Sequence, residues 1–141
     1  MVYLKSSKAI GSFLGLGTHV WLVIVSNDGE KTTFSGSRVG KLLGVIKNFK
    51  RDYDKLPHRG EVIISPPHTM TQEEWDMAIL EAGDVIQSTM NKELRFSGFF
   101  PCVKNYGNCC TIAKRIIELA GGVVPASRNF RGFTPGLTID Y

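Results

Sequence analysis

A hairpin signal near the N-terminus is the strongest constraint on the fold of this chain. Residues Thr18 to Ser26 form a dense run of β-branched and aromatic side chains, which favours a strand. Asn27-Asp28-Gly29 follows, a tripeptide typical of tight turns, and strand-like residues resume from Lys31 to Ser35. The sequence therefore predicts an antiparallel pair of strands joined by a tight turn.

The segment after the hairpin predicts a helix. From Arg38 to Tyr53 apolar residues recur at steps of three and four, and Ser37 occupies the N-cap position. Farther along, Glu61 to Ser65 is a candidate strand, and Leu94 to Phe100 is a second strand or an extended segment. For residues 122–141 we expect mostly loop or a late strand.

Two more helices are expected downstream. Thr71 opens one of them, and Glu74 three residues later completes a capping box. Asn108 is a good N-cap for the other, which ends at Gly121-Gly122. The buried stripe predicted for the first of these helices consists of Trp75, Ala78, Ile79, Ala82, Ile86 and Met90.

Strands and helices together indicate an α+β protein with a small antiparallel sheet packed against helices. A length of 141 residues leaves room for one domain, which we take as residues 1–141.

The longest strongly apolar run, Val20 to Val25, is much shorter than the ~20 residues of a membrane span. The N-terminal residues lack the continuous apolar core of a signal peptide, so we expect synthesis in the cytoplasm and no Sec export.

The chain carries 17 basic and 13 acidic residues, for a net charge of +4. A local basic cluster is more typical of a solvated helix face than of a nucleic-acid contact, so nucleic acid is not expected as a partner. The cluster comprises Lys47, Lys50, Arg51, Lys55 and Arg59.

The three cysteines, Cys102, Cys109 and Cys110, are too few and too close together for a secreted disulfide framework. Cys109 falls in the first turn of the helix capped by Asn108, where the helix dipole should make a thiol ionise more readily. If that helix packs on the hairpin sheet, His19 can approach the sulfur. A thiol and an imidazole in contact form the pair needed for nucleophilic catalysis.

Two other interpretations of these residues remain open at this point. Cys109 and Cys110 can be small core residues, with His19 a structural strand residue. A zinc site is the second, because the cysteines, His19, His58 and His68 are possible ligands. The chain has no Cys-x-x-Cys motif and no closely spaced histidine pair, so we expect neither a metal nor a cofactor.

Two stretches of the chain resemble a known family. Gly17-Thr18-His19-Val20-Trp21 with the strand that follows, the Asp28-Gly29 turn and Phe34-Ser35-Gly36 look like a histidine hairpin. Asn105-Tyr106-Gly107-Asn108-Cys109-Cys110-Thr111, running on to Gly121-Gly122, is similar to an Asn-Cys-x-Thr nucleophile helix. Together they resemble the circularly permuted branch of the NlpC-like, papain-like cysteine hydrolases, in which the histidine strand precedes the cysteine helix.

The resemblance implies roles for individual residues. Cys109 would be the nucleophile, His19 the general base and Cys110 a bystander. Members of the family usually orient the histidine with a polar residue on the next strand, where this chain offers Thr33, Ser35 and Ser37, of which we choose Ser35. The oxyanion would lie near the backbone amide of Cys109.

The resemblance also implies a range of activities. The first is a cysteine amidase or endopeptidase that cuts the peptide stems of peptidoglycan, or another amide or acyl substrate. Without a signal peptide, such an enzyme would be a toxin delivered to the periplasm of a target cell, for example by type VI secretion, with an immunity protein as partner. The alternatives are an acyltransferase or lipid hydrolase related to lecithin retinol acyltransferase and a non-catalytic binding module. The lipid alternative needs an apolar channel, for which the candidates are Phe96, Phe99, Phe100, Phe130 and Phe133.

Overall fold

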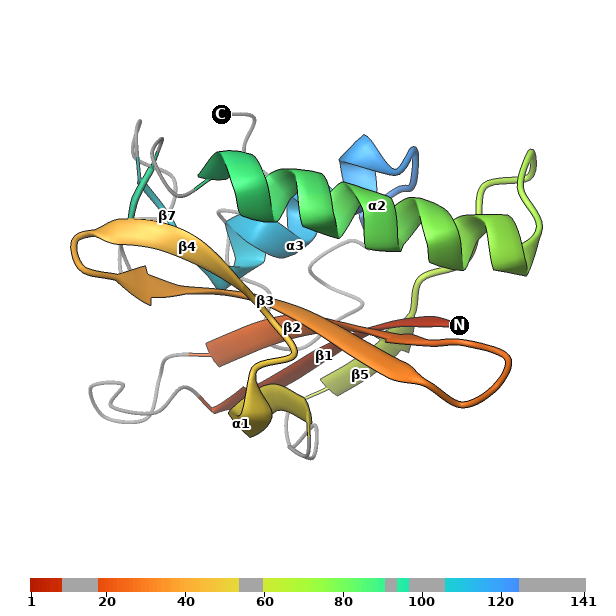
Figure 1. Ribbon diagram of the computed structural model, residues 1–141, viewed down its shortest axis with the longest axis horizontal. Coiled ribbons are helices and arrows are strands. Elements are labelled where there is room, and N and C mark those ends of the chain that lie inside the picture. Colours follow the sequence, from red (N-terminus) through yellow and green to blue (C-terminus); the bar gives the residue numbers. More distant parts are fainter. Residues whose placement is uncertain (9–17, 54–59, 91–93, 97–105, 125–141) are drawn as a thin grey trace.

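A seven-stranded sheet organises the chain in the computed structural model, which describes residues 1–8, 18–53, 60–90, 94–96 and 106–124 (Figure 1). The strands are β1 (Val2–Lys8), β2 (Thr18–Val25), β3 (Lys31–Val39), β4 (Leu42–Lys47), β5 (Gly60–Ile63), β6 (Arg95–Phe96) and β7 (Tyr106–Gly107). The helices are α1 (Lys50–Tyr53), α2 (Gln72–Met90) and α3 (Cys109–Leu119).

The order of strands in the sheet is β5-β1-β2-β3-β4-β6-β7, and every neighbouring pair is antiparallel except β6 and β7. Helices α2 and α3 cover one face of the twisted sheet, and α1 lies on the other side (Figure 1). The α+β class expected from the sequence is confirmed. Strand β1, which the sequence pattern did not indicate, pairs with β2 along its whole length.

The hairpin of β2 and β3 is confirmed, with Gly29 in the turn at a φ of 86°, a conformation that glycine adopts without steric cost. Side chains alternate along β2: Val20, Leu22 and Ile24 enter the core under α2 and α3. His19 and Trp21 therefore leave β2 on the opposite face.

The helix predicted from Arg38 to Tyr53 is wrong for most of its length. Residues up to Val39 complete β3, Gly40 turns the chain with a φ of 64°, and Leu42–Lys47 returns as β4. Ser37, expected as an N-cap, pairs with Gly44 inside the sheet. The buried residues are consecutive in each strand, 33–36 in β3 and 43–45 in β4, so the apolar steps of three and four do not mark one buried face. Cross-strand pairing outweighs the helical pattern.

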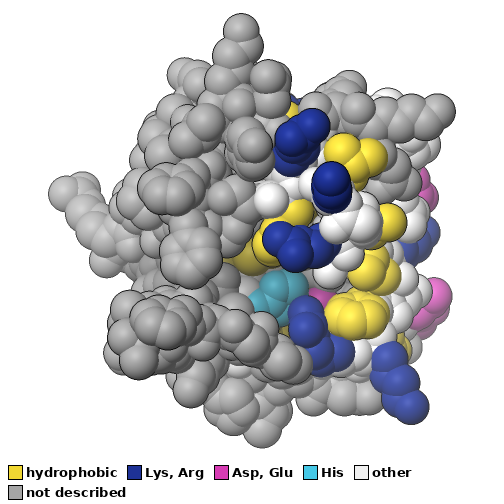
Figure 2. Space-filling view, turned by 90° about the vertical axis from the view of Figure 1, so that its left-hand side faces the viewer, with side chains coloured by type: hydrophobic (Ala, Val, Ile, Leu, Met, Phe, Trp, Pro, Cys, Tyr) yellow, Lys and Arg dark blue, Asp and Glu magenta, His cyan; other side chains and the backbone are white. Residues whose placement is uncertain are grey.

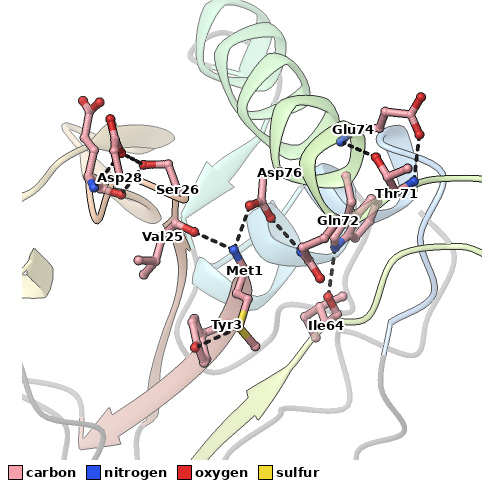
Figure 3. A network of polar contacts seen from close by, with 12 residues as sticks. Met1, Tyr3, Val25, Ser26, Asp28, Ile64, Thr71, Gln72, Glu74 and Asp76 are labelled. Carbon is pink, nitrogen blue, oxygen red and sulfur yellow. Dashed lines mark hydrogen bonds and ion pairs between the residues drawn. The ribbon is translucent and has the colours of Figure 1, made fainter.

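Helix α2 is joined to the sheet by polar contacts at its N-terminal end (Figure 3). Thr71 and Glu74 form the expected capping box, with Glu74 N–H donating to Thr71 Oγ1 at 3.2 Å and Thr71 N–H to Glu74 Oε2 at 2.7 Å. Trp75 Nε1 donates to the carbonyl of Ile64 at 2.9 Å, and Asp76 accepts from the Met1 ammonium at 2.7 Å. These contacts fix the helix over β1 and β5.

The predicted stripe of α2 buries Trp75, Ile79, Ala82 and Ile86 against the core, and Ala78 is partly buried. The strand predicted from Glu61 to Ser65 corresponds to β5, and β6 lies within the segment predicted from Leu94 to Phe100. In the part of the chain that the structure describes, no helix combines the length and apolarity needed to cross a membrane.

Gly36 on β3 lets α3 lie against the sheet. A Cβ at this position would be 2.6 Å from Ile112 Cγ1 and 2.9 Å from Cys109 Cα, closer than real contacts allow.

We predict that Gly36→Ala lowers the free energy of unfolding by about 1–3 kcal/mol, because the backbone must move to make room for the methyl group. Ser37→Ala on the same strand should stay within about 0.5 kcal/mol of wild type. Urea unfolding measures both, and equal stabilities would show that the close approach is not there.

Candidate active site

Cys109 lies where the sequence places it, in the first turn of α3. Asn108 caps the helix: its side-chain oxygen accepts from the N–H of Cys110 at 2.9 Å and of Thr111 at 3.4 Å, and its own N–H donates to Thr111 Oγ1 at 3.1 Å. The capping box fixes the position of Cys109 relative to the sheet. It also occupies two of the amides that would otherwise face an anion.

The sulfur of Cys109 reaches the edge of strand β2. Pairing between β2 and β3 starts at Trp21 with Ser35, one residue after Val20. The N–H of Val20 donates to Cys109 Sγ at 3.4 Å. Because backbone N–H groups point along the plane of a sheet, the sulfur lies in the opening between the two strands. The structure thus brings Cys109 beside the peptide bond that joins Val20 to His19.

His19 is held from the other face of the sheet by Asp52 of α1. The Nε2 atom of His19 and Oδ1 of Asp52 are 2.8 Å apart, and the two side chains are 8% and 0% exposed. The imidazole also stacks on Trp21, with ring centroids 5.5 Å apart and planes inclined by 13°. A hydrogen bond and a stacking contact together fix the orientation of the ring.

Burial alone would raise the pKa of the Asp52 carboxyl, but its neighbours lower the pKa below the ordinary value. The hydrogen bond and positive charge of His19 act most strongly in this direction, followed by Ser35 and Arg51. Arg51 Nε is 3.7 Å from Asp52 Oδ1. Asp52 is therefore an anion at neutral pH, buried next to the imidazole.

The charge of Asp52 decides which nitrogen of His19 carries the proton. An ionised carboxylate can only accept, so Nε2 donates to it. In the neutral ring Nδ1 is then the unprotonated nitrogen, the one that can take a proton from a thiol. This assignment gives His19 the correct tautomer for a general base.

The thiol of Cys109 is not easily ionised in the unliganded protein. Its pKa lies well above the ordinary value, first because of the hydrogen bond that it shares with Cys110, then because of burial and the charge of Cys110. The N–H groups of Val20 and Cys110 act in the opposite direction. The sequence-based prediction of a readily ionised thiol is wrong, because a neighbouring thiol and desolvation outweigh the helix dipole.

Ser35, the residue chosen to orient the histidine, is buried beside Asp52. Its Oγ makes no hydrogen bond of normal geometry to the described residues, and neither does Asp52 Oδ2. The group that bonds to the imidazole is Asp52, which the sequence analysis missed. The resemblance points only to the strand after the histidine, and the basic cluster around Arg51 is typical of a solvated helix face. An aspartate inside that cluster was the available signal.

The remaining candidate residues lie elsewhere. Cys110 is fully buried in the core. His68 is exposed and, with Pro66, Pro67 and Gly122, lines a cleft of about 300 Å³ near the C-terminal end of α3. Cys102, His58, Phe99, Phe100, Phe130 and Phe133 lie outside the described residues. Within the described ranges no three His, Cys, Asp or Glu side chains are grouped to hold a metal ion.

One face of the molecule combines a histidine, set back from the surface, with several Lys and Arg side chains (Figure 2). Comparison of the chain with models of protein families, with curated proteins and with solved structures gave no match. Function must therefore be argued from the residues of the site.

Removing the second thiol should activate the first. We predict that Cys110→Ala increases the rate at which iodoacetamide alkylates Cys109 at pH 7 several-fold, because the largest cause of the raised pKa is gone. Peptide mapping by mass spectrometry separates the cysteines, and Cys109→Ala controls for labelling elsewhere. An unchanged rate would mean that Cys110 does not hold the Cys109 thiol neutral.

Asp52 should make stability depend on pH in a defined direction. Its pKa is lower in the folded protein than the ordinary 3.8, so its contribution is present above that value and is lost as the pH falls through the folded pKa. We predict that Asp52→Asn lowers the free energy of unfolding at pH 7 by about 1–3 kcal/mol. The difference from wild type should shrink below pH ~4.

The matched control for this measurement is Asp84→Asn, which breaks an exposed ion pair with Lys47. It should cost less than about 1 kcal/mol. Equal losses in the two variants, or a difference between wild type and Asp52→Asn that does not change from pH 7 to pH 3, would contradict a buried Asp52 anion that its neighbours stabilise.

Proposed function

We propose that this protein is a cysteine hydrolase of the papain-like type, an amidase or endopeptidase in which the histidine strand precedes the cysteine helix. The observation that carries the proposal is the 2.8 Å hydrogen bond between Asp52 and His19, next to the strand edge that Cys109 Sγ reaches. A carboxylate, an imidazole and a thiol in this order form the relay used for nucleophilic attack on a carbonyl.

In the proposed mechanism His19 acts as a general base rather than as one half of a preformed ion pair. The raised pKa keeps the Cys109 thiol protonated until a substrate is bound. Nδ1 of His19 takes the thiol proton as Sγ attacks the carbonyl carbon, and Asp52 stabilises the imidazolium that forms. The imidazolium then protonates the leaving amine, and water hydrolyses the acyl-enzyme by the same relay.

The proposed substrate is the peptide stem of bacterial cell wall. A small basic protein can be retained near this anionic polymer by electrostatic attraction. The proposal includes delivery to the periplasm of a target cell and an immunity protein in the producing cell. For the lipid alternative, the channel candidate among the described residues is Phe96, whose ring lies under the Arg38 guanidinium.

A binding module without catalysis is the second candidate function. The raised pKa of Cys109 favours it, because a thiol that stays neutral is a poor nucleophile unless a base removes its proton. The two candidates differ in what His19 does, and kinetics on variants separate them.

The test is digestion of purified peptidoglycan, with soluble fragments analysed by mass. We predict that Cys109→Ala and His19→Ala release no fragments and that Asp52→Asn reduces the rate by about 10²–10⁴-fold, because the imidazole loses its orienting charge. Ser35→Ala should reduce it less than about tenfold. No release by wild type from several wall chemistries would contradict the hydrolase and leave the binding module.

A further inference from the structure

A basic cleft of about 220 Å³ lies at the end of the β3–β4 hairpin, beside β6. It is lined by Arg38, Gly40, Lys41, Arg95 and Phe96. Three of its five residues carry a positive charge, and all three are exposed. In the described part of the chain no salt bridge joins any of them to a carboxylate.

The register of the sheet places the two arginines of the cleft on opposite faces at this edge. Arg38 lies opposite Leu43 in the β3–β4 pair and shares its face, whereas Arg95 lies opposite Leu42 in the β4–β6 pair and shares the other face. The Arg38 guanidinium stacks over the Phe96 ring at 5.3 Å, which limits its freedom before any ligand arrives. A guanidinium held in this way can bind the two oxygens of one carboxylate, and Lys41 and Arg95 add positive charge to the lining of the cleft.

Two strands that line the cleft, β3 and β6, also lie next to the segment around Cys109. Arg38 is two residues beyond Gly36, the residue packed against Cys109 Cα, and leaves β3 on the same face. At ~3.3 Å per residue its Cα is roughly 7 Å farther along the strand. On the other side, Phe96 pairs with Gly107, two residues before Cys109.

We propose that this cleft is a substrate subsite that binds a carboxylate of a peptide whose amide is presented to Cys109. The inference rests on the proposed function and narrows its substrate to acidic peptides. A volume of about 220 Å³ is large enough for one small group. Arg38 lies two residues along β3 from Gly36, which packs against Cys109 Cα.

Binding to the Cys109→Ala chain tests the subsite without turnover. The probes are a stem tetrapeptide with free carboxylates at its glutamate and its C-terminus, two peptides amidated at one or the other, and a fully amidated one. Calorimetry should give a Kd for the best free-carboxylate peptide at least about tenfold lower than for the fully amidated peptide. The singly amidated peptides identify which carboxylate is bound.

Charge removal in the cleft should abolish this preference. Arg38→Gln with Arg95→Gln is expected to raise the Kd of the acidic peptide about tenfold and to leave the amidated peptide unchanged. Lys5→Gln with Lys47→Gln removes the same charge from other parts of the sheet and should retain the preference. Equal effects of the two double variants would overturn the subsite, since general charge would then explain binding.

Cleavage by the chain with Cys109 intact separates the subsite from the proposed function. Cleavage of free and amidated peptides at equal rates supports the hydrolase and overturns the subsite. Arginine-dependent binding of acidic peptides without any cleavage supports the carboxylate site and overturns the hydrolase. Arginine-dependent binding of phosphatidylglycerol vesicles, with no preference among the peptides, overturns the proposal in favour of a lipid surface.

Discussion

The hydrogen bond between Asp52 and His19 is the interaction on which the rest of the site depends. Taking a carboxylate out of water is costly, and this one is completely buried. Helix α1 is a single turn and packs against β3, so it carries Asp52 to the face of the sheet from which His19 projects. The bond gives the imidazole one orientation and one tautomer, and both are required of a base.

The second constraint is the place where β2 and β3 separate. A continuous pairing would use the N–H of Val20 within the sheet and leave no room for a side chain from α3. Here that N–H donates to Cys109 Sγ. On β3, across the opening, Gly36 has no side chain, and α3 can therefore lie close to the sheet. The thiol therefore reaches the backbone of the residue that follows His19, while the imidazole lies on the other face of the sheet. In the proposed mechanism the thiol stays neutral until His19 takes its proton, so the raised pKa of Cys109 is consistent with that mechanism.

Local signals predicted much of the fold and part of the site. The capping box at Thr71, the N-cap at Asn108 and the turn at Gly29 depend on neighbouring residues, and all three are confirmed. The helix predicted from Arg38 to Tyr53 is wrong because the segment up to Lys47 forms the end of β3 and the strand β4 that pairs with it, and the spacing of apolar residues does not reveal cross-strand pairing. Asp52 was missed for a related reason: its role comes from contact with His19, 33 residues away in the chain. The raised pKa of Cys109 likewise reflects burial and a neighbouring thiol, which the position of a helix start does not reveal.

Nuclear magnetic resonance of ¹⁵N-histidine-labelled protein tests the central claim most directly. Long-range ¹H–¹⁵N spectra should show the neutral His19 ring protonated on Nε2, with Nδ1 bare, and Cys109→Ala should shift the Nδ1 resonance while a distant Lys5→Gln does not. A ring protonated on Nδ1, or an Nδ1 resonance unaffected by loss of the sulfur, would contradict a relay of Asp52, His19 and Cys109.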